Sequence, residues 1–234
     1  MAGFYLSVEF GIDYWLRLWD NARMKDLVMT GWCGVGFAMM ASRTIPIMYR
    51  YARKHGMDFA VENLAGPKPP SWEKVGGLIA GLEEFDRILW VDCDVVIADD
   101  EVNLFDEMGD GAVQAMVEHS TDCGVVPNCG VWAVTRDMLG VLQKIDSSDH
   151  HLNHPWWEQA AMLEQMGYEV TGSPTANLVA PTTLYDRTTF LSPRWNHHPM
   201  DANRPANARF FHATTYDDRL GFVTAMADAV EGKK

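Results

Sequence analysis

The sequence predicts an α/β fold, in which helices flank a mixed, mostly parallel central sheet. Between residues 27 and 97, short apolar runs alternate with segments whose apolar residues recur at helical spacing, the pattern of strands joined by helical crossovers. With 234 residues, of which 47% are hydrophobic and 22% charged, the chain can bury the core of one large domain. We therefore expect a single domain over residues 1–234.

The pattern begins with a strand, a helix and a second strand. Residues 27–30 form an apolar run that ends at Gly31 and predict the first strand. A helix is expected over residues 44–55, because Gly56 tolerates the left-handed conformation that often ends a helix. Residues 59–62 predict the second strand.

The pattern continues with a helix and a long strand. Ser71 is placed as an N-cap, and apolar side chains recur at helical spacing as far as Phe85. Residues 88–97 follow as one apolar strand that contains Asp92 and Asp94. The further expected elements are strands at 112–117 and 129–135 and helices at 136–145 and 156–166.

The N-terminal residues 1–26 stay unassigned as an extension, although 4–10 alternate like a strand and 14–25 suit a short helix. The chain begins without the basic segment and apolar core of a signal peptide. Nor does any stretch reach the roughly 18 apolar residues that indicate a membrane span. We expect a soluble, cytoplasmic protein.

Charge and cysteine content narrow the partners. The formal net charge of −13 argues against nucleic acid and anionic membrane surfaces, whose phosphates attract clustered lysine and arginine. An anionic substrate would need a metal bridge or a local basic residue. The four cysteines form no CxxC pair and suit a reducing compartment. Buried thiols are favoured over a Cys123–Cys129 disulfide.

Asp92 and Asp94 are the most informative residues of the chain. On a strand, side chains two residues apart project to the same side. Carboxylates at the end of a buried strand are costly without a cation between them, and a divalent metal with hard oxygen ligands is the simplest candidate. Because ligands bind beyond the carboxyl ends of strands in open α/β sheets, this position suits a site.

Six short motifs occur in order along the chain: Tyr51-Ala-Arg-Lys-His-Gly-Met-Asp58, Trp72-Glu-Lys74, Leu89-Trp-Val-Asp-Cys-Asp94, Asn128-Cys-Gly-Val-Trp132, Trp157-Glu-Gln159 and Phe210-Phe-His212-Ala-Thr. Together they resemble the metal-dependent glycosyltransferases of the GT-A fold. The chain is most similar to the mannan, galactomannan and xyloglucan transferases, and more distantly to glycogenin-like retaining enzymes. The resemblance covers about residues 27–216 and implies transfer of a sugar to a glycan or other hydroxyl acceptor.

The resemblance implies a metal site and a donor. Asp92, Asp94 and His212 become the ligands of a manganese ion, with magnesium as the other possibility, that bridges the phosphates of a nucleotide-diphosphate sugar. Mixed oxygen and nitrogen ligation favours manganese over calcium. The donor is a UDP- or GDP-sugar. The alternatives are that the aspartates cap backbone amides and that His212 is an ordinary core histidine.

Four further residues are assigned to donor binding. By resemblance, Lys74 contacts the nucleotide or its phosphates, while Asn128 and Gly130 contact the donor sugar, glycine allowing a close approach to the backbone. Thr30, at the end of the first strand, is included with them. The competing interpretations are a solvated helix lysine for Lys74 and an ordinary turn into a strand at Gly130.

Glu158 and Gln159 resemble the acidic residue and glutamine near the reacting carbon, where they would orient hydroxyls and stabilise developing positive charge. The family transfers with retention, which requires either a carboxylate nucleophile or a same-face substitution. We favour the same-face route, with the metal stabilising the departing diphosphate. Helix capping by Glu158 is the structural alternative.

Histidine and tryptophan groups are candidates for other sites. His150 and His154 have a spacing that suits a metal on a helix, but the intervening sequence favours a loop, so we expect no second metal site. By resemblance, the segment Trp195-Asn-His-His-Pro199 lines the acceptor side. Trp156, Trp157 and Trp195 are therefore candidates for stacking on sugar rings, with burial in the core as the alternative.

Two other functions remain open. A haloacid-dehalogenase-like phosphatase also ends a strand with Asp-x-Asp, here Asp92 and Asp94, and Asp217 and Asp218 would mimic its later acidic pair. That interpretation leaves His212 without a role. A non-catalytic relative that binds nucleotide sugars is the second alternative, and turnover separates it from the enzyme.

Overall fold

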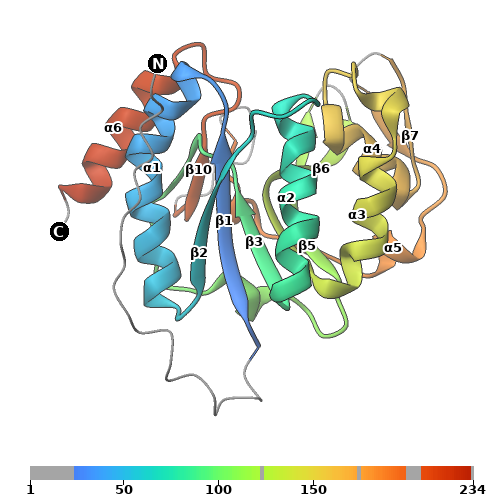
Figure 1. Cartoon of the computed structure of the whole chain (residues 1–234), viewed down its shortest axis with the longest axis horizontal. Coiled ribbons are helices and arrows are strands. Elements are labelled where there is room, and N and C mark those ends of the chain that lie inside the picture. The colour runs from blue at the N-terminus through green and yellow to red at the C-terminus, as the bar shows by residue number, and fades with distance from the viewer. Residues whose placement is uncertain (1–23, 122–123, 173–174, 199–206, 233–234) are drawn as a thin grey trace.

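The computed structural model describes residues 24–121, 124–172, 175–198 and 207–232, and Figure 1 shows the arrangement of its elements. The elements expected at 4–10 and 14–25 fall almost wholly outside these residues.

In chain order, the strands and longer helices are β1 (Asp26–Trp32), α1 (Val35–Lys54), β2 (Asp58–Asn63), α2 (Pro70–Glu84), β3 (Arg87–Val91), β4 (Val95–Ile97), β5 (Gln114–Thr121), β6 (Gly124–Thr135), α3 (Leu139–Asp146), α4 (Trp157–Met166), β7 (Tyr168–Val170), β8 (Ala176–Leu178), α5 (Thr183–Asp186), β9 (Thr188–Leu191), β10 (Phe210–His212) and α6 (Arg219–Glu231). Short 3-10 turns are η1 (Leu104–Glu107), η2 (Arg136–Met138), η3 (Asp149–His151) and η4 (Pro193–Trp195).

Six strands form the central sheet, in the order β2-β1-β3-β6-β5-β9. The β1–β2, β1–β3 and β5–β9 pairs are parallel, whereas β6 runs antiparallel to both β3 and β5. The predicted mixed, mostly parallel sheet is therefore confirmed. The helical crossovers α1 and α2 make the parallel order 2-1-3 possible, since parallel neighbours need a long connection.

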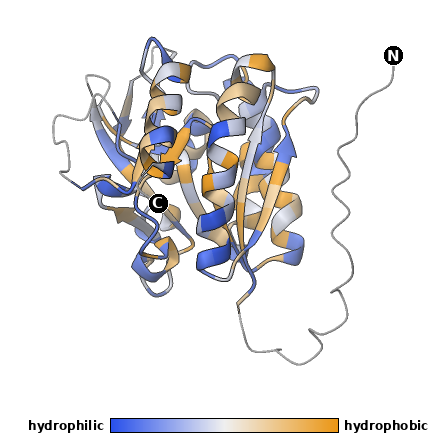
Figure 2. Cartoon of the chain, turned by 90° about the vertical axis from the view of Figure 1, so that its left-hand side faces the viewer, coloured by the Kyte–Doolittle hydropathy of each residue, from blue (hydrophilic) through white to orange (hydrophobic). Residues whose placement is uncertain are grey.

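The sheet is covered on both faces, and each face has its own core. Alternate side chains of β1 point to opposite sides: Leu27 and Met29 pack with α2, α3 and α4, and Val28 packs with α1 and α6. Residues buried on both faces explain why these strands read as continuous apolar runs. Figure 2 shows hydrophobic colours concentrated in the strands and mixed colours on the helices.

A small second sheet positions the C-terminal part of the chain. β10 pairs antiparallel with β4, so that His212 lies opposite Val95. The backbone N–H of Ala213 also donates to the carbonyl oxygen of Asp94 at 3.0 Å. These bonds hold His212 next to the segment that follows β3.

Several predicted boundaries were wrong. β6 begins at Gly124, not at residue 129, and β5 runs to Thr121, not 117. α1 begins at Val35, not near residue 44, because methionine and alanine in this stretch are good helix formers. Ser71 is not the N-cap of α2: Pro69 holds that position, and Pro70 occupies the first helical turn, where its missing N–H costs nothing.

The predicted strand 88–97 is likewise two strands. It breaks after Val91, and the N–H of Val95 donates to the carbonyl oxygen of Asp92 at 2.9 Å across a turn. Asp92 and Asp94 therefore belong to a turn, and not to one straight edge. Within the described residues, no helix is long and apolar enough to cross a membrane.

Candidate active site

A cavity of about 620 Å³ opens where β1 and β3 end. Its walls come from the residues after these two strands, the first turns of α2 and α4, the segment around Asn128 in β6, and the end of β10. The site thus lies at the carboxyl ends of the parallel strands, as expected for an open α/β sheet. Its volume is in the range of small-molecule and cofactor sites.

Asp92 lies on the floor of the cavity. Its backbone N–H donates to the carbonyl oxygen of Gly130 at 2.8 Å, which fixes the turn against β6. Its Oδ1 accepts from Trp90 Nε1 at 2.6 Å and lies 3.5 Å from Lys74 Nζ. The carboxylate is partly exposed to the cavity, with 32% of its side chain accessible.

Asp94 is buried beside His212. His212 Nε2 lies 3.4 Å from Asp94 Oδ1 and 4.0 Å from Asp92 Oδ2, so that one ring nitrogen faces both carboxylates. Burial raises the pKa of Asp94, but the neighbouring imidazole of His212 and guanidinium of Arg219 outweigh it, and the pKa lies below its usual value. The ligand atoms of all three residues lie within 4.8 Å of one another. The structure therefore brings the three predicted metal ligands together.

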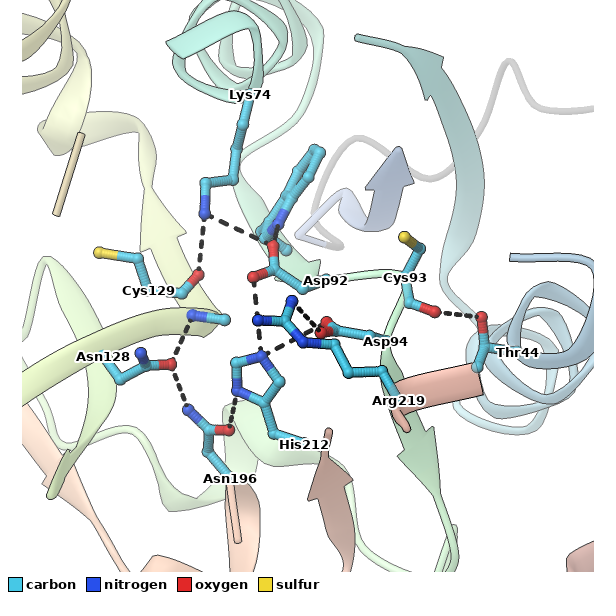
Figure 3. Close-up of polar contacts among 12 residues, drawn as sticks. Thr44, Lys74, Asp92, Cys93, Asp94, Asn128, Cys129, Asn196, His212 and Arg219 are labelled. Atoms are coloured by element: carbon cyan, nitrogen blue, oxygen red, sulfur yellow. Dashed lines mark hydrogen bonds and ion pairs between the residues drawn. The ribbon is translucent and has the colours of Figure 1, made fainter. Parts of the chain in front are cut away.

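A chain of side-chain hydrogen bonds fixes the other side of the His212 ring, as Figure 3 shows. His212 Nδ1 pairs with Asn196 Oδ1 at 3.0 Å, and Asn196 Nδ2 donates to Asn128 Oδ1 at 2.8 Å. Because an amide oxygen only accepts, Nδ1 must carry the proton. In the neutral ring Nε2 then offers its lone pair to the space beside Asp92 and Asp94, as metal ligation requires.

Gly130 makes room for this histidine. A Cβ atom at Gly130 would lie 2.2 Å from His212 Cε1 and 2.9 Å from Asn128 Oδ1, well inside contact distance. By resemblance, the space at this glycine is assigned to the donor sugar, whereas in the structure the imidazole of His212 lies there. The N–H of Gly130 also donates to Asn128 Oδ1 at 2.9 Å.

Lys74 and Glu158 form a buried ion pair across the cavity wall. Nζ lies 2.6 Å from Glu158 Oε1, with side chains only 4% and 6% exposed, and 3.3 Å from the carbonyl oxygen of Cys129. Burial by itself lowers the pKa of Lys74, but Asp92 and Glu158 raise it far above its usual value, so the lysine stays charged. Lys74 thus joins Asp92 to Glu158.

Gln159 follows Glu158 in the first turn of α4. Its Oε1 accepts from Asn128 Nδ2 at 3.0 Å and from the Cys129 N–H at 3.3 Å. Both bonds use the carbonyl oxygen, and the Nε2 group takes no part in them. The hydrogen-bonded chain therefore runs from Gln159 through Asn128 and Asn196 to His212.

Of the remaining candidate residues, some line the cavity and others are buried away from it. Thr30 is fully buried within β1 and does not line the cavity, whereas the next residue, Gly31, does. Trp195 is fully buried and donates to Glu107 Oε2 at 2.6 Å. Trp156 and Trp157 line the cavity, and Trp157 is the one non-glycine residue with positive φ (45°) in the described part of the chain.

Several site residues were missed from the sequence. The sequence places Asn196 and His198 only within the acceptor-side segment, and it does not identify Arg219 or His119. Arg219 begins α6 and lies 3.6 Å from Asp94 Oδ2. His119 and His198 line the cavity with ring centroids 5.0 Å apart. No local pattern distinguishes them, since each reaches the site through long-range packing.

Known proteins resemble this chain in fold and not in sequence. No family model and no curated sequence matches the chain. Among solved structures, a glycosyltransferase involved in the glycosylation of the major capsid of PBCV-1 has a TM-score of 0.62 at 16% identity, covering 88% of this chain and 99% of that one.

Two other solved structures give the same result. The glycosyltransferase GlyE of Streptococcus pneumoniae TIGR4 has a TM-score of 0.59 at 12% identity. The match covers 90% of this chain and 63% of the GlyE chain. The galactosyltransferase LgtC, in complex with donor and acceptor sugar analogues, has a TM-score of 0.51 at 10% identity, covering 87% and 95%. The predicted resemblance is confirmed at this level: the chain has the fold of the GT-A glycosyltransferases.

Proposed function

We propose that this chain is a metal-dependent glycosyltransferase, which moves a hexose or pentose from a UDP- or GDP-sugar to a hydroxyl acceptor with retention of configuration. The observation that carries the proposal is the convergence of Asp92, Asp94 and His212 on the floor of a large cavity. This arrangement occurs in a fold shared with glycosyltransferases.

The three residues suit a divalent ion. Two carboxylates and the Nε2 of His212, with the Nδ1 proton held by Asn196, make a donor set of hard oxygen and imidazole nitrogen. Such a set favours manganese, or magnesium, and leaves coordination positions open. A bound ion would contact the donor diphosphate and stabilise the charge of the leaving group.

The chain itself supplies few cations for the phosphates. The charge of Lys74 is shared between Glu158 and Asp92, so we assign it to holding the site together. Arg219 is 40% exposed, lines the cavity and contacts Asp94 only at 3.6 Å. It is therefore the better placed of the two to donate to a phosphate oxygen, an addition to the set predicted from the sequence.

The surroundings of Glu158 bear on how configuration is retained. A nucleophile must reach the anomeric carbon, but Glu158 is buried and held by Lys74 at 2.6 Å. This favours the same-face substitution over a covalent intermediate. Gln159 then binds the donor sugar or steadies positive charge at the reacting carbon, since its Oε1 is fixed by Asn128 while its Nε2 can donate to a hydroxyl.

The phosphatase alternative leaves His212 and the chain of hydrogen bonds behind it without a role, and we do not retain it. A non-catalytic binding protein would share every feature of the site. Turnover separates the two.

The test is the release of UDP or GDP from a panel of their sugar conjugates, with and without manganese. Each donor is tested first with water in place of the acceptor hydroxyl, and a panel of simple glycosides is then added. Manganese-dependent release that fails in Gln159→Ala, while this variant still binds the nucleotide, supports catalysis. Manganese-dependent binding without release from any donor would favour the non-catalytic alternative.

A further inference from the structure

A second group of metal-binding side chains lies outside the cavity. His150 and His151 end η3, and Glu164 lies near the end of α4. Glu164 Oε2 is 3.1 Å from His150 Nε2 and 3.4 Å from His151 Nε2, so that both imidazoles meet the same carboxylate oxygen. The ligand atoms of the three residues lie within 4.8 Å of one another.

His151 is the most informative member of this group. Its side chain is only 9% exposed, and within the described residues its Nε2 makes no hydrogen bond. Leaving a buried polar atom without a hydrogen bond is costly, so such an atom calls for an explanation such as an ion. An ion held between His150, His151 and Glu164 would give this nitrogen a partner.

His154, which the sequence pairs with His150, is not part of the group. Its Nε2 donates to the carbonyl oxygen of Thr171 at 2.8 Å, and its Nδ1 accepts from the Trp156 N–H at 3.1 Å. Both ring nitrogens are therefore used in fixing the loop before α4. The i, i+4 spacing of His150 and His154 would bring them together only on a continuous helix. η3 ends at His151 and α4 begins at Trp157, so His150 lies beside Glu164 instead.

We propose that His150, His151 and Glu164 form a second metal site, which binds zinc or a similar transition metal. Two imidazoles and one carboxylate are a ligand set typical of zinc, with a fourth position left for water. The Asp92, Asp94 and His212 group differs because carboxylates outnumber the imidazole. The two sites are thus expected to prefer different metals, and the second does not depend on the proposed function.

The position of the site gives it a structural role. An ion there joins η3 to the far end of α4, the helix whose first turn carries Glu158 and Gln159. A metal that binds only the folded chain raises its stability by mass action. The site therefore acts as a clamp on the helix that presents these two residues to the cavity.

The test is a calorimetric titration of the whole chain with zinc. His150→Gln and Glu164→Gln each remove one ligand, and these side chains are 60% and 45% exposed, so both variants should fold. Glu169→Gln, an exposed carboxylate on β7, is the matched control because it makes the same change of charge nearby.

We expect the wild type and the control to bind one zinc ion that both ligand variants lose, or bind at least about tenfold more weakly, since even an outer-shell change costs 10–100-fold. The comparison holds whether or not the Asp92, Asp94 and His212 group also takes zinc, because that contribution is the same in all four proteins. Equal numbers of ions bound with equal affinity in all four would overturn the proposal.

Discussion

Two groups of acidic residues face the same cavity, and their surroundings differ. Glu158 is neutralised within the protein by Lys74 at 2.6 Å, and both side chains are buried. Asp92 and Asp94 instead meet their cationic neighbours only at longer range: Asp92 lies 3.5 Å from Lys74, and Asp94 lies 3.4 Å from His212 and 3.6 Å from Arg219. The first group is a closed ion pair, and the second is a loose cluster.

The difference separates structure from chemistry. Glu158, buried and at hydrogen-bond distance from Lys74, has little room for a further cation, whereas carboxylates held apart around a histidine leave space for one. We therefore interpret Lys74 and Glu158 as the support of the site, and Asp92, Asp94 and His212 as its metal ligands.

Asp94→Asn, which tests Asp94 as a metal ligand, has the largest expected effect. The amide keeps the shape but loses the charge that a metal requires, and a metal contributes several kcal/mol to the reaction. We expect metal-dependent nucleotide binding to disappear and any donor turnover to fall at least about a thousandfold. Asp110→Asn, an exposed carboxylate in the loop before β5, is the control. A variant that still binds nucleotide in a metal-dependent way would contradict the assignment.

Lys74→Met tests the closed pair. Removing the lysine leaves Glu158 buried without a cation, which typically costs roughly 3–5 kcal/mol of unfolding free energy. Urea denaturation measures the loss, and adding Glu158→Leu should restore most of it. Lys54→Met is the control, because that lysine, 37% exposed, pairs with Asp100 and Glu101 at the surface, and its loss should leave stability almost unchanged. Similar losses for both lysines would mean that the pair has no special role.

Substitutions of Asn196 test whether this residue fixes the tautomer of His212. Asn196→Leu removes the acceptor for Nδ1–H, and we expect manganese affinity to fall roughly 10–100-fold. Asn196→Asp keeps an acceptor there, so affinity should recover even though the bond to Asn128 is lost. If Asp and Leu weaken manganese binding equally, Asn196 contributes packing and does not position the ring.

Gly130→Ala has the smallest expected effect. The new methyl group must displace the His212 ring, and overpacking of this kind costs roughly 1–3 kcal/mol. Manganese binding should weaken with it. The control is Gly140→Ala in α3, where a Cβ meets no atom within 4 Å and alanine favours the helix. Unchanged manganese affinity in Gly130→Ala would show that the ring tolerates the shift.

Much of the fold could be predicted because its signals are local. Strands buried on both faces and joined by helices give the alternation over residues 27–97, and the observed β2-β1-β3 order follows from it. The start of α1 and the break after Val91 were not predicted, because helix propensity and hydrophobicity alone locate neither a helix start nor a tight turn.

Part of the site was predicted residue by residue, but its connections were not. The motifs identify Asp92, Asp94 and His212, and the structure brings them together. The pairing of His212 with Asn196 depends on how β10 and the segment after η4 pack. Similarly, Lys74 and Glu158 meet only because α2 and α4 begin at the same edge of the sheet. Such contacts follow from tertiary packing and leave no local pattern.

The most direct test of the metal-ligand assignment is the melting temperature of the wild type with UDP, GDP and their sugar conjugates, each with and without manganese. A ligand at a hundred times its dissociation constant adds about 2.7 kcal/mol of stability. We predict a rise with one nucleotide that requires manganese and is absent in Asp94→Asn. A rise that is the same without manganese, or no rise with any nucleotide, would contradict the assignment of Asp92, Asp94 and His212 as the ligands of a nucleotide-bound metal.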